Sequence, residues 1–264
     1  MNELTDKVTG VNIYPVKSCQ AATVNGESPT ELSVGRTGFE ANGAHDREWL
    51  VVENDGLFVS QRGWNHAEMA ENARTDRTLA TISVDVQKER VVLSATGYEK
   101  LELPVEYDSD REPELVSMHG RTLWAVDEGK NPSGWFSEFL GRSVRLVRIS
   151  RERPRSLPLE YQRQGASNTV AGADSMPFLL VSQASLDQLH DEAGEERGVV
   201  SMDRYRANIE IDGYGIGAFA EDKIKELAIN GLFRAYIVKP CARCPIPNID
   251  QKTGVNDGKS NKLL

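Results

Sequence analysis

Short runs of apolar and β-branched residues, separated by tight turn signals, constrain the fold of this 264-residue chain more than any other feature of its sequence. Residues 48–53 form one such run, Asn54-Asp55-Gly56 closes it, and 57–60 resumes it, which predicts a hairpin. The other segments with a strand pattern are 8–14, 79–86, 90–95, 115–118, 121–126, 208–211 and 233–238. Many short strands joined in this way are typical of barrels and strongly bent sheets.

Helix signals are few by comparison. They occur at 133–140, at 183–193 and, more weakly, at 65–74. Asn131-Pro132 precedes the first segment and Gly141 follows it, which is the usual order of cap, first-turn proline and terminating glycine. We therefore expect an α+β chain that is mostly β, with few short helices.

Charge and composition exclude several classes of protein. The net charge is −9 and the pI about 5.1, whereas a general nucleic-acid binder is usually basic. Three cysteines do not make a disulfide framework, and no apolar stretch approaches the length of a membrane span. The polar start of the chain carries no signal region. We expect a cytoplasmic protein with no nucleic-acid or membrane partner.

Two of the three cysteines lie in one motif, Cys241-Ala242-Arg243-Cys244, directly after the predicted strand 233–238. A redox dithiol would favour a helix after the first cysteine, but Pro247 lies in the residues that follow. Zinc would need more ligands, and the only other cysteine is Cys19 while the histidines are scattered. A third interpretation is a single thiolate that holds a soft metal whose other ligands come with it. Arg243 argues against a pair of cysteines that only fills space, because a guanidinium lowers the pKa of a neighbouring thiol.

A metal group that carries phosphate would also need a site for an anion. Lys17-Ser18, in a turn after Tyr14-Pro15, has the ammonium and hydroxyl of a phosphate cradle. Arg47 opens the next apolar strand, and Arg206 with Asn208 could form a polar grip at the start of another. Taken singly, each of these could equally be a solvated loop or a surface ion pair. The arginine-rich stretch 142–163 ends in a proline-containing loop that marks a domain boundary or a functional loop.

Taken together, these residues resemble those of the MOSC-domain proteins, in particular the two-part group that includes the YcbX-type proteins and the mitochondrial amidoxime-reducing component. The segments that carry the resemblance are Tyr14-Pro15-Val16-Lys17-Ser18, Asp46-Arg47 with Trp49-Leu50-Val51-Val52, Pro177-Phe178-Leu179-Leu180 with Ser185-Leu186, and Cys241-Ala242-Arg243-Cys244 with Asp250 and Thr253-Gly254. They occur in the order of the family and span almost the whole chain.

The resemblance implies a β-barrel MOSC core over 126–264, packed with an N-terminal β-rich companion domain over 1–125. It implies that a molybdenum cofactor binds between them, with Cys244 as the metal ligand and catalytic residue. The positions that would grip its phosphate and pterin are Lys17, Ser18, Arg47, Arg206, Asn208 and Arg243. The implied activity is reduction of N-hydroxylated compounds by cleavage of the N–O bond; the family also carries an association with pyridoxal phosphate.

Three departures from the family pattern affect these expectations. This sequence has no cysteine cluster like that of the ferredoxin-like domain of larger bacterial members, so we expect a separate donor, a flavoprotein or an iron–sulfur or haem carrier. The pattern continues beyond the point where this chain ends at Leu264, which predicts truncation or a different closure of the barrel. Ala207 replaces the usual proline in Tyr205-Arg206-Ala207-Asn208. The alternatives to a reductase are a carrier of sulfur or cofactor and a degenerate domain that no longer holds cofactor.

Overall fold

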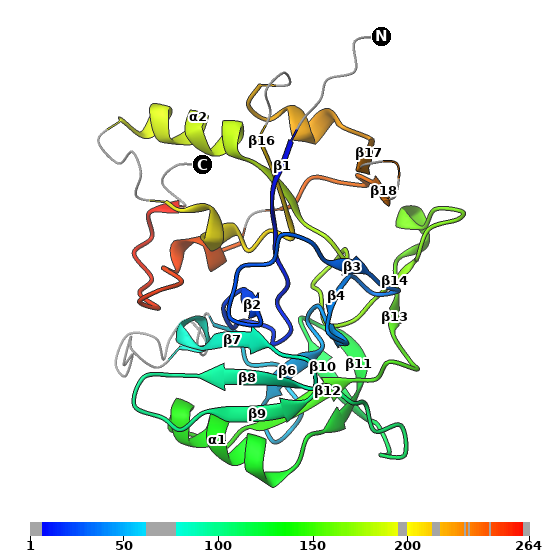
Figure 1. Cartoon of the computed structure of the whole chain (residues 1–264), viewed down its shortest axis with the longest axis vertical. Helices are drawn as coiled ribbons and strands as arrows, with labels where there is room; N and C mark the ends of the chain where they lie inside the picture. The colour runs from blue at the N-terminus through cyan, green and yellow to red at the C-terminus, as the bar shows by residue number, and fades with distance from the viewer. Residues whose placement is uncertain are drawn as a thin grey trace.

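The structure is a computed structural model that describes residues 7–61, 78–194, 200–212, 217–229, 231, 233–242 and 244–260. Short strands dominate these residues, and two α-helices lie among them, which confirms the expected α+β, mostly β, fold. In Figure 1 the lower part of the molecule holds two four-stranded sheets and α1, whereas the upper part holds α2 and the smaller sheets. The predicted helix at 65–74 lies outside the described residues.

One antiparallel sheet has the order β10-β11-β12-β6, from β10 (Glu114–Met118), β11 (Arg121–Asp127), β12 (Arg145–Ile149) and β6 (Trp49–Val52). All four residues of β6 are fully buried, because both faces of the strand are covered. The predicted hairpin after β6 is present, with Glu53 N bonded to Leu57 O at 2.8 Å and Val59 N to Val51 O at 2.8 Å. Its second arm pairs through isolated bridges only.

The second sheet has the order β2-β7-β8-β9, from β2 (Ala22–Val24), β7 (Ser83–Val86), β8 (Arg90–Ser94) and β9 (Leu101–Pro104). The predicted strand 79–86 is wrong at its beginning, where Leu79–Thr81 forms a 3-10 turn. The hydroxyl of Thr78 accepts a hydrogen bond from Ala80 N at 3.0 Å, and this local cap favours the turn over an extended strand.

Helix α1 (Lys130–Leu140) packs on β12 and β9 and buries Phe136 and Phe139. The prediction that Asn131 caps it is wrong, because the cap residue is Gly129, at φ 94°. Pro132 therefore lies inside the first turn, where its missing N–H has no intrahelical partner to lose. Gly141 ends the helix in the left-handed conformation, as its position predicted.

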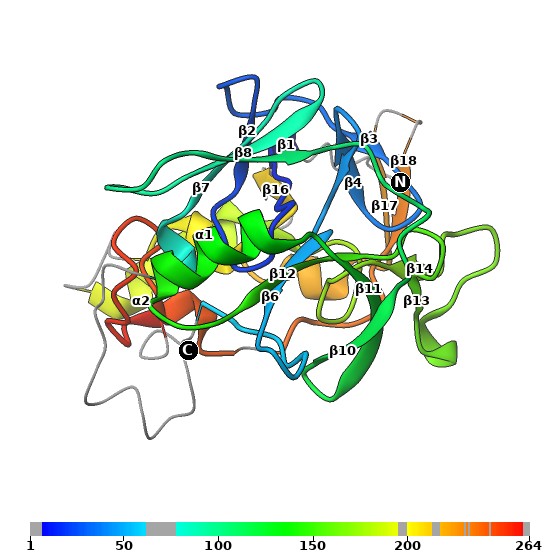
Figure 2. The same ribbon diagram turned by 90° about the horizontal axis from the view of Figure 1, so that it is seen from below.

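The beginning of the described chain pairs with strands from its second half in a third sheet. β1 (Lys7–Val11) is antiparallel to β16 (Ile209–Asp212), and β16 is parallel to β15 (Leu180–Ser182). Helix α2 (Gln183–Ala193) connects β15 to β16, as the helix signal predicted (Figures 1 and 2). The remaining strands are β3 (Ser33–Val34), β4 (Phe39–Ala41), β5 (Ala44–His45), β13 (Arg155–Ser156), β14 (Thr169–Val170), β17 (Glu226–Ile229) and β18 (Phe233–Tyr236).

The main buried cluster contains residues from both parts of the chain. Ile13 and Val16, which follow β1, belong to the same buried cluster as Ile209 and Ile211 on β16. The N-terminal segment thus packs with strands from late in the chain. The division at 125/126 falls inside β11 and stays a prediction. Among the described residues, neither α-helix has the length and apolar character of a bilayer span.

Candidate functional site

A tight turn after β1 fixes the first predicted site residues. Lys17 N donates to Trp49 O at 2.9 Å, and Cys19 N donates to Val16 O at 3.2 Å. Ser18, between them, takes a left-handed conformation at φ 73°. Lys17 is buried, and its ammonium lies 2.7 Å from Asp174 Oδ1. The turn therefore holds a lysine in place inside the protein rather than in solvent.

Two arginines enclose the ring of Tyr14. The guanidinium carbon of Arg47 lies 4.7 Å from the ring centroid, and that of Arg206 lies 4.5 Å from it. Both arginines are themselves in the left-handed region, at φ 52° and 55°, where non-glycine residues are uncommon. Backbone strain of this kind clusters at functional sites.

Hydrogen bonds then fix the direction of each guanidinium. Arg47 Nη1 donates to Asn208 Oδ1 at 2.9 Å and is also paired with Asp46. Arg206 Nη1 donates to Gln251 Oε1 at 3.0 Å. Residues predicted from three separate segments thus come together, and we call Lys17, Arg47 and Arg206 the cation cluster.

The cation cluster carries more positive charge than its surroundings neutralise. Its carboxylate partners are Asp46 and Asp174. Burial lowers the pKa of Lys17 and of Arg206, because the charged forms lose solvation. Burial also raises the pKa of Tyr14 to about 12, so this hydroxyl stays neutral and bonds Ala207 O at 3.3 Å. One buried lysine and two half-buried arginines beside two carboxylates are suited to an anionic ligand.

The cysteine loop faces the same cavity as the cation cluster. Strand β18 ends at Tyr236, and Pro245 begins the 3-10 turn Ile246–Asn248. Between them Cys241 and Cys244 are both exposed. A cavity of about 1140 Å³ is lined by Cys244 together with predicted residues of the other two segments, namely Lys17, Ser18, Arg47, Arg206 and Asn208. Arg243 lies outside the described residues.

The sequence analysis missed residues that support this site. Arg204, only 3% exposed, donates to Asp250 Oδ2 at 2.9 Å and to both carboxylate oxygens of Asp257 at 3.0 Å. It therefore fastens the segment after the cysteine loop next to Arg206. Asp174 and His119 were also missed, and their contact of 3.5 Å borders Lys17. The pairing of Arg204 with Asp250 and Asp257, and of Asp174 with His119, is visible only in the folded structure. Of these residues, only Asp250 belonged to a segment that the sequence had singled out for the site.

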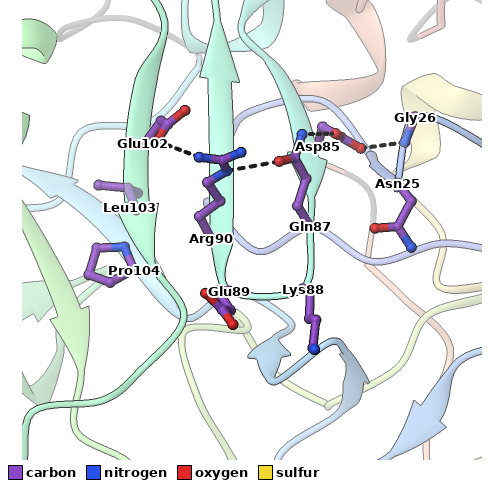
Figure 3. Close-up of a pocket in the computed structure, with 10 residues that line it drawn as sticks. All are labelled: Asn25, Gly26, Asp85, Gln87, Lys88, Glu89, Arg90, Glu102, Leu103 and Pro104. Carbon is purple, nitrogen blue, oxygen red and sulfur yellow. Dashed lines mark hydrogen bonds and ion pairs between the residues drawn. The ribbon is translucent and has the colours of Figure 1, made fainter.

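A second hollow, on the sheet of β7, β8 and β9, is a weaker candidate (Figure 3). Its charged side chains bond each other: Arg90 reaches Glu102 at 3.0 Å and Gln87 at 2.9 Å, and Gln87 donates to Asp85 at 2.9 Å. It contains no cysteine or histidine among its described lining residues. The side chains of Arg90, Gln87 and Asp85 thus bond one another rather than a ligand.

Metal binding by side chains alone finds no support in the described part of the chain. No group of three or more His, Cys, Asp and Glu side chains there could hold a metal ion. A single soft thiolate can bind a metal whose other ligands come from a cofactor.

Comparison with known families agrees with the fold. The profile of the MOSC N-terminal beta barrel domain matches residues 5–143, and that of the MOSC domain matches residues 167–263. The two matches together cover most of the chain. The protein belongs to the MOSC-domain family.

Two kinds of curated relative are similar to this chain. The molybdenum cofactor sulfurase of Homo sapiens is 31% identical over 94% of this chain but only 27% of its own length. The mitochondrial amidoxime-reducing component 1 of Mus musculus is 31% identical over 94% of this chain and 66% of its own length. The chain therefore spans about a quarter of the sulfurase and just under two thirds of the amidoxime-reducing component.

A solved structure gives a much weaker match. The solution structure of a protein from Bordetella bronchiseptica aligns with 47% of this chain and 92% of its own. Its identity is 20% and its TM-score 0.33.

Proposed function

We propose that this protein binds a molybdenum cofactor and reduces N-hydroxylated compounds at a molybdenum held by Cys244. The observation that carries the proposal is the shared cavity, on which the Cys244 loop and the cation cluster open together. The relatives named amidoxime-reducing components support the same assignment.

The residues present fit such a cofactor. Its phosphate needs cations on the cavity wall, and Lys17, Arg47 and Arg206 supply three. Asn208 fixes the orientation of the Arg47 guanidinium by accepting its hydrogen bond. Ser18, in the left-handed conformation, adds a hydroxyl to the cavity lining. Cys244 supplies one thiolate, and its exposure in the loop leaves it accessible to a metal.

When bound, the cofactor would supply a metal that accepts and returns electron pairs. The overall reaction converts an N–OH group and two electrons with two protons into N–H and water. The chain's own residues bind and orient: the cation cluster holds the anionic end of the cofactor away from the reacting group. Burial alone would raise the pKa of Asp174, but the charge of Lys17 outweighs it and holds this pKa below its usual value, so Asp174 lines the cavity wall as a carboxylate that fixes the ammonium of Lys17.

The two electrons would come from a separate donor, a flavoprotein or an iron–sulfur or haem carrier. A reduction assay with benzamidoxime and a chemical electron donor tests the proposal on protein from a host that makes the cofactor. We expect turnover in the wild type and its loss in Cys244→Ser. Cys241→Ser, from the same exposed loop, is the matched control and should retain turnover. Equal turnover in both variants would refute the assignment of Cys244.

A second candidate function is a carrier of sulfur or of cofactor for other enzymes. It is favoured by the two exposed thiols of one loop and by the sulfurase relatives. Mass spectrometry of the alkylated protein separates the two functions. A persulfide on Cys241 or Cys244, in protein without reductase activity, would favour the carrier. The association with pyridoxal phosphate and the cytoplasmic location stay predictions.

A further inference from the structure

The cavity has more positive charge than the cation cluster explains. Among the described residues that line it, eight are Lys or Arg and three are Asp or Glu. The chain as a whole has a net charge of −9. An acidic protein that concentrates cations on one cavity has an electrostatic reason to attract anions there.

One of the remaining cations, Arg121, is unpaired among the described residues. It is the first residue of β11, it lines the cavity, and its side chain makes no hydrogen bond or ion pair with any of them. By contrast, Arg234 is paired with Glu226 at 2.8 Å, and Lys239 lies over the ring of Tyr161. Arg121 is therefore available to a ligand.

A second arginine, Arg155, lies near enough to Arg121 for the two charges to interact. Its Nη2 donates to Ala173 O at 2.8 Å, but its buried Nε has no partner among the described groups. Burial, and next the positive charge of Arg121, lower the pKa of Arg155. Two like charges held near each other, one with an unsatisfied donor, are stabilised by an anion between them.

The position of Arg121 relative to the cation cluster follows from the β10–β11 turn. His119, in this turn, lies 3.5 Å from Asp174 Oδ1, which in turn lies 2.7 Å from Lys17 Nζ. The ring of Phe58 packs against His119 at 5.4 Å, and Lys17 Nζ lies 5.4 Å from the same ring. The turn thus borders the cation cluster through Asp174 and Phe58.

The cavity lining also contains a buried carboxamide. Gln61 is 3% exposed, and both its Nε2 and its Oε1 lack a hydrogen-bond partner among the described residues. A buried amide with no partner is rare, because it has lost water without gaining another bond. Its presence in the wall is a second sign that a polar ligand completes this region.

We propose that Arg121, with the guanidinium of Arg155 near it and His119 on the same turn, forms an anion subsite at the cavity mouth that binds the carboxylate or phosphate of an N-hydroxylated substrate. This inference rests on the proposed function for the nature of the substrate. The cation cluster holds the cofactor's anionic end, and the outer subsite selects substrates that carry an acidic group of their own.

The test compares two probes that differ by one charge, benzamidoxime and 4-carboxybenzamidoxime. Calorimetric titration of the full chain measures their affinities without requiring turnover. We expect the carboxylated probe to bind about tenfold more tightly, the effect of one or two charge-assisted hydrogen bonds. The preference should shrink as salt is added, since the subsite is partly exposed.

Single substitutions show which residue is responsible for the preference for the carboxylated probe. Arg121→Gln should bring the ratio of the two affinities close to one, whereas Arg90→Gln, an exposed arginine in the hollow of Figure 3, should leave it at the wild-type value. Equal affinities in the wild type would overturn the subsite. So would a preference that survives Arg121→Gln but disappears in Lys17→Met, because the probe would then occupy the cation cluster.

Failure of the subsite and failure of the reductase are distinguishable. Tight, Arg121-dependent binding of the carboxylated probe without any reduction would support the subsite but contradict the proposed reductase activity. Reduction of both probes with equal kcat/KM would support the reductase and overturn the subsite. In an active protein, the expected effect of Arg121→Gln on the carboxylated substrate is a rise in KM with little change in kcat, because the contact lies away from the reacting group.

Discussion

Arg47 and Asn208, 161 residues apart in the chain, are joined by a hydrogen bond of 2.9 Å from the guanidinium to the amide oxygen. The same amide donates to Asn12 O at 3.1 Å, and its oxygen also accepts from Leu179 N at 3.3 Å. One buried side chain thus connects the segment after β1, the strand β15 and the strand β16 to the cation cluster. This connection places the site at the junction of the two halves of the chain.

Asn208→Ala should therefore lower both stability and order in the site. Asn208 is 1% exposed, so its removal leaves buried donors and acceptors unpaired, at a cost of about 1–3 kcal/mol. Denaturant unfolding measures this change. Asn54→Ala, which removes an exposed bond to Ser143, is the control and should change stability by about 0.5 kcal/mol or less. A similar small effect in both variants would contradict the role of Asn208.

Gly172→Ala tests how closely the backbone packs against Arg47. A Cβ at this position would lie 2.5 Å from Arg47 O, which is itself bonded to Gly172 N at 3.0 Å. We expect a loss of about 1–3 kcal/mol from overpacking, with Arg47 displaced. Gly134→Ala has open space inside α1 and should instead stabilise the protein by up to about 1 kcal/mol. Thermal unfolding of the two variants gives shifts of opposite sign if the packing is as described.

Lys17→Met should not destabilise the unliganded protein, although Lys17 is buried. Because burial lowers the folded-state pKa of Lys17 below its unfolded value, the charged lysine opposes folding at neutral pH. Its partner Asp174 is 63% exposed and can be solvated when the lysine is removed. We expect an equal or higher free energy of unfolding together with reduced cofactor retention. The exposed Lys88→Met is the control, and a marked loss of stability confined to Lys17→Met would contradict this account.

Acid should loosen the segment that follows the cysteine loop. Burial alone would raise the pKa of Asp257, but the hydrogen bond from Arg204 outweighs it and holds the pKa below its usual value. This stabilisation is present above the ordinary aspartate pKa of about 3.9 and is lost as the pH falls through the folded-state pKa.

Hydrogen exchange over residues 246–260 at decreasing pH checks this prediction. Wild-type protection should fall below about pH 4, after correction for the intrinsic exchange rate. Asp257→Asn should show reduced protection already at neutral pH and a weaker acid dependence. Asp108→Asn, at an exposed ion pair with Arg111, should behave as the wild type. Acid-independent protection in the wild type would mean that the Arg204 contacts do not hold this segment.

The sequence predicted the hairpins well because their turns are local. His119-Gly120 and Asn54-Asp55-Gly56 specify reversals through backbone preference alone, and the structure has both. The start of α1 was misplaced because Gly129, whose N–H donates to Asp127 Oδ1 at 2.6 Å, takes the cap position. The bond from Gly129 N to Asp127 Oδ1 makes Gly129 the cap residue in place of Asn131, and the local sequence pattern does not reveal this bond.

The sequence predicted only those residues of the candidate site that belong to recognisable local motifs. Lys17, Arg47 and Cys244 belong to motifs whose residue types indicate chemistry, and the structure places all three on one cavity. Arg204 and Gln61 carry no such motif. Their importance follows from burial and from partners distant in sequence, which only the folded chain brings together.

We propose that Cys244 holds a molybdenum and that the cation cluster binds the cofactor of this metal. Elemental mass spectrometry of protein from a host that makes the cofactor tests it most directly, with Cys244→Ala and Cys241→Ala measured in parallel. The account predicts near-stoichiometric molybdenum in the wild type and in Cys241→Ala, and its loss in Cys244→Ala. A wild-type protein without molybdenum, or a Cys244→Ala variant that retains it fully, would contradict the account.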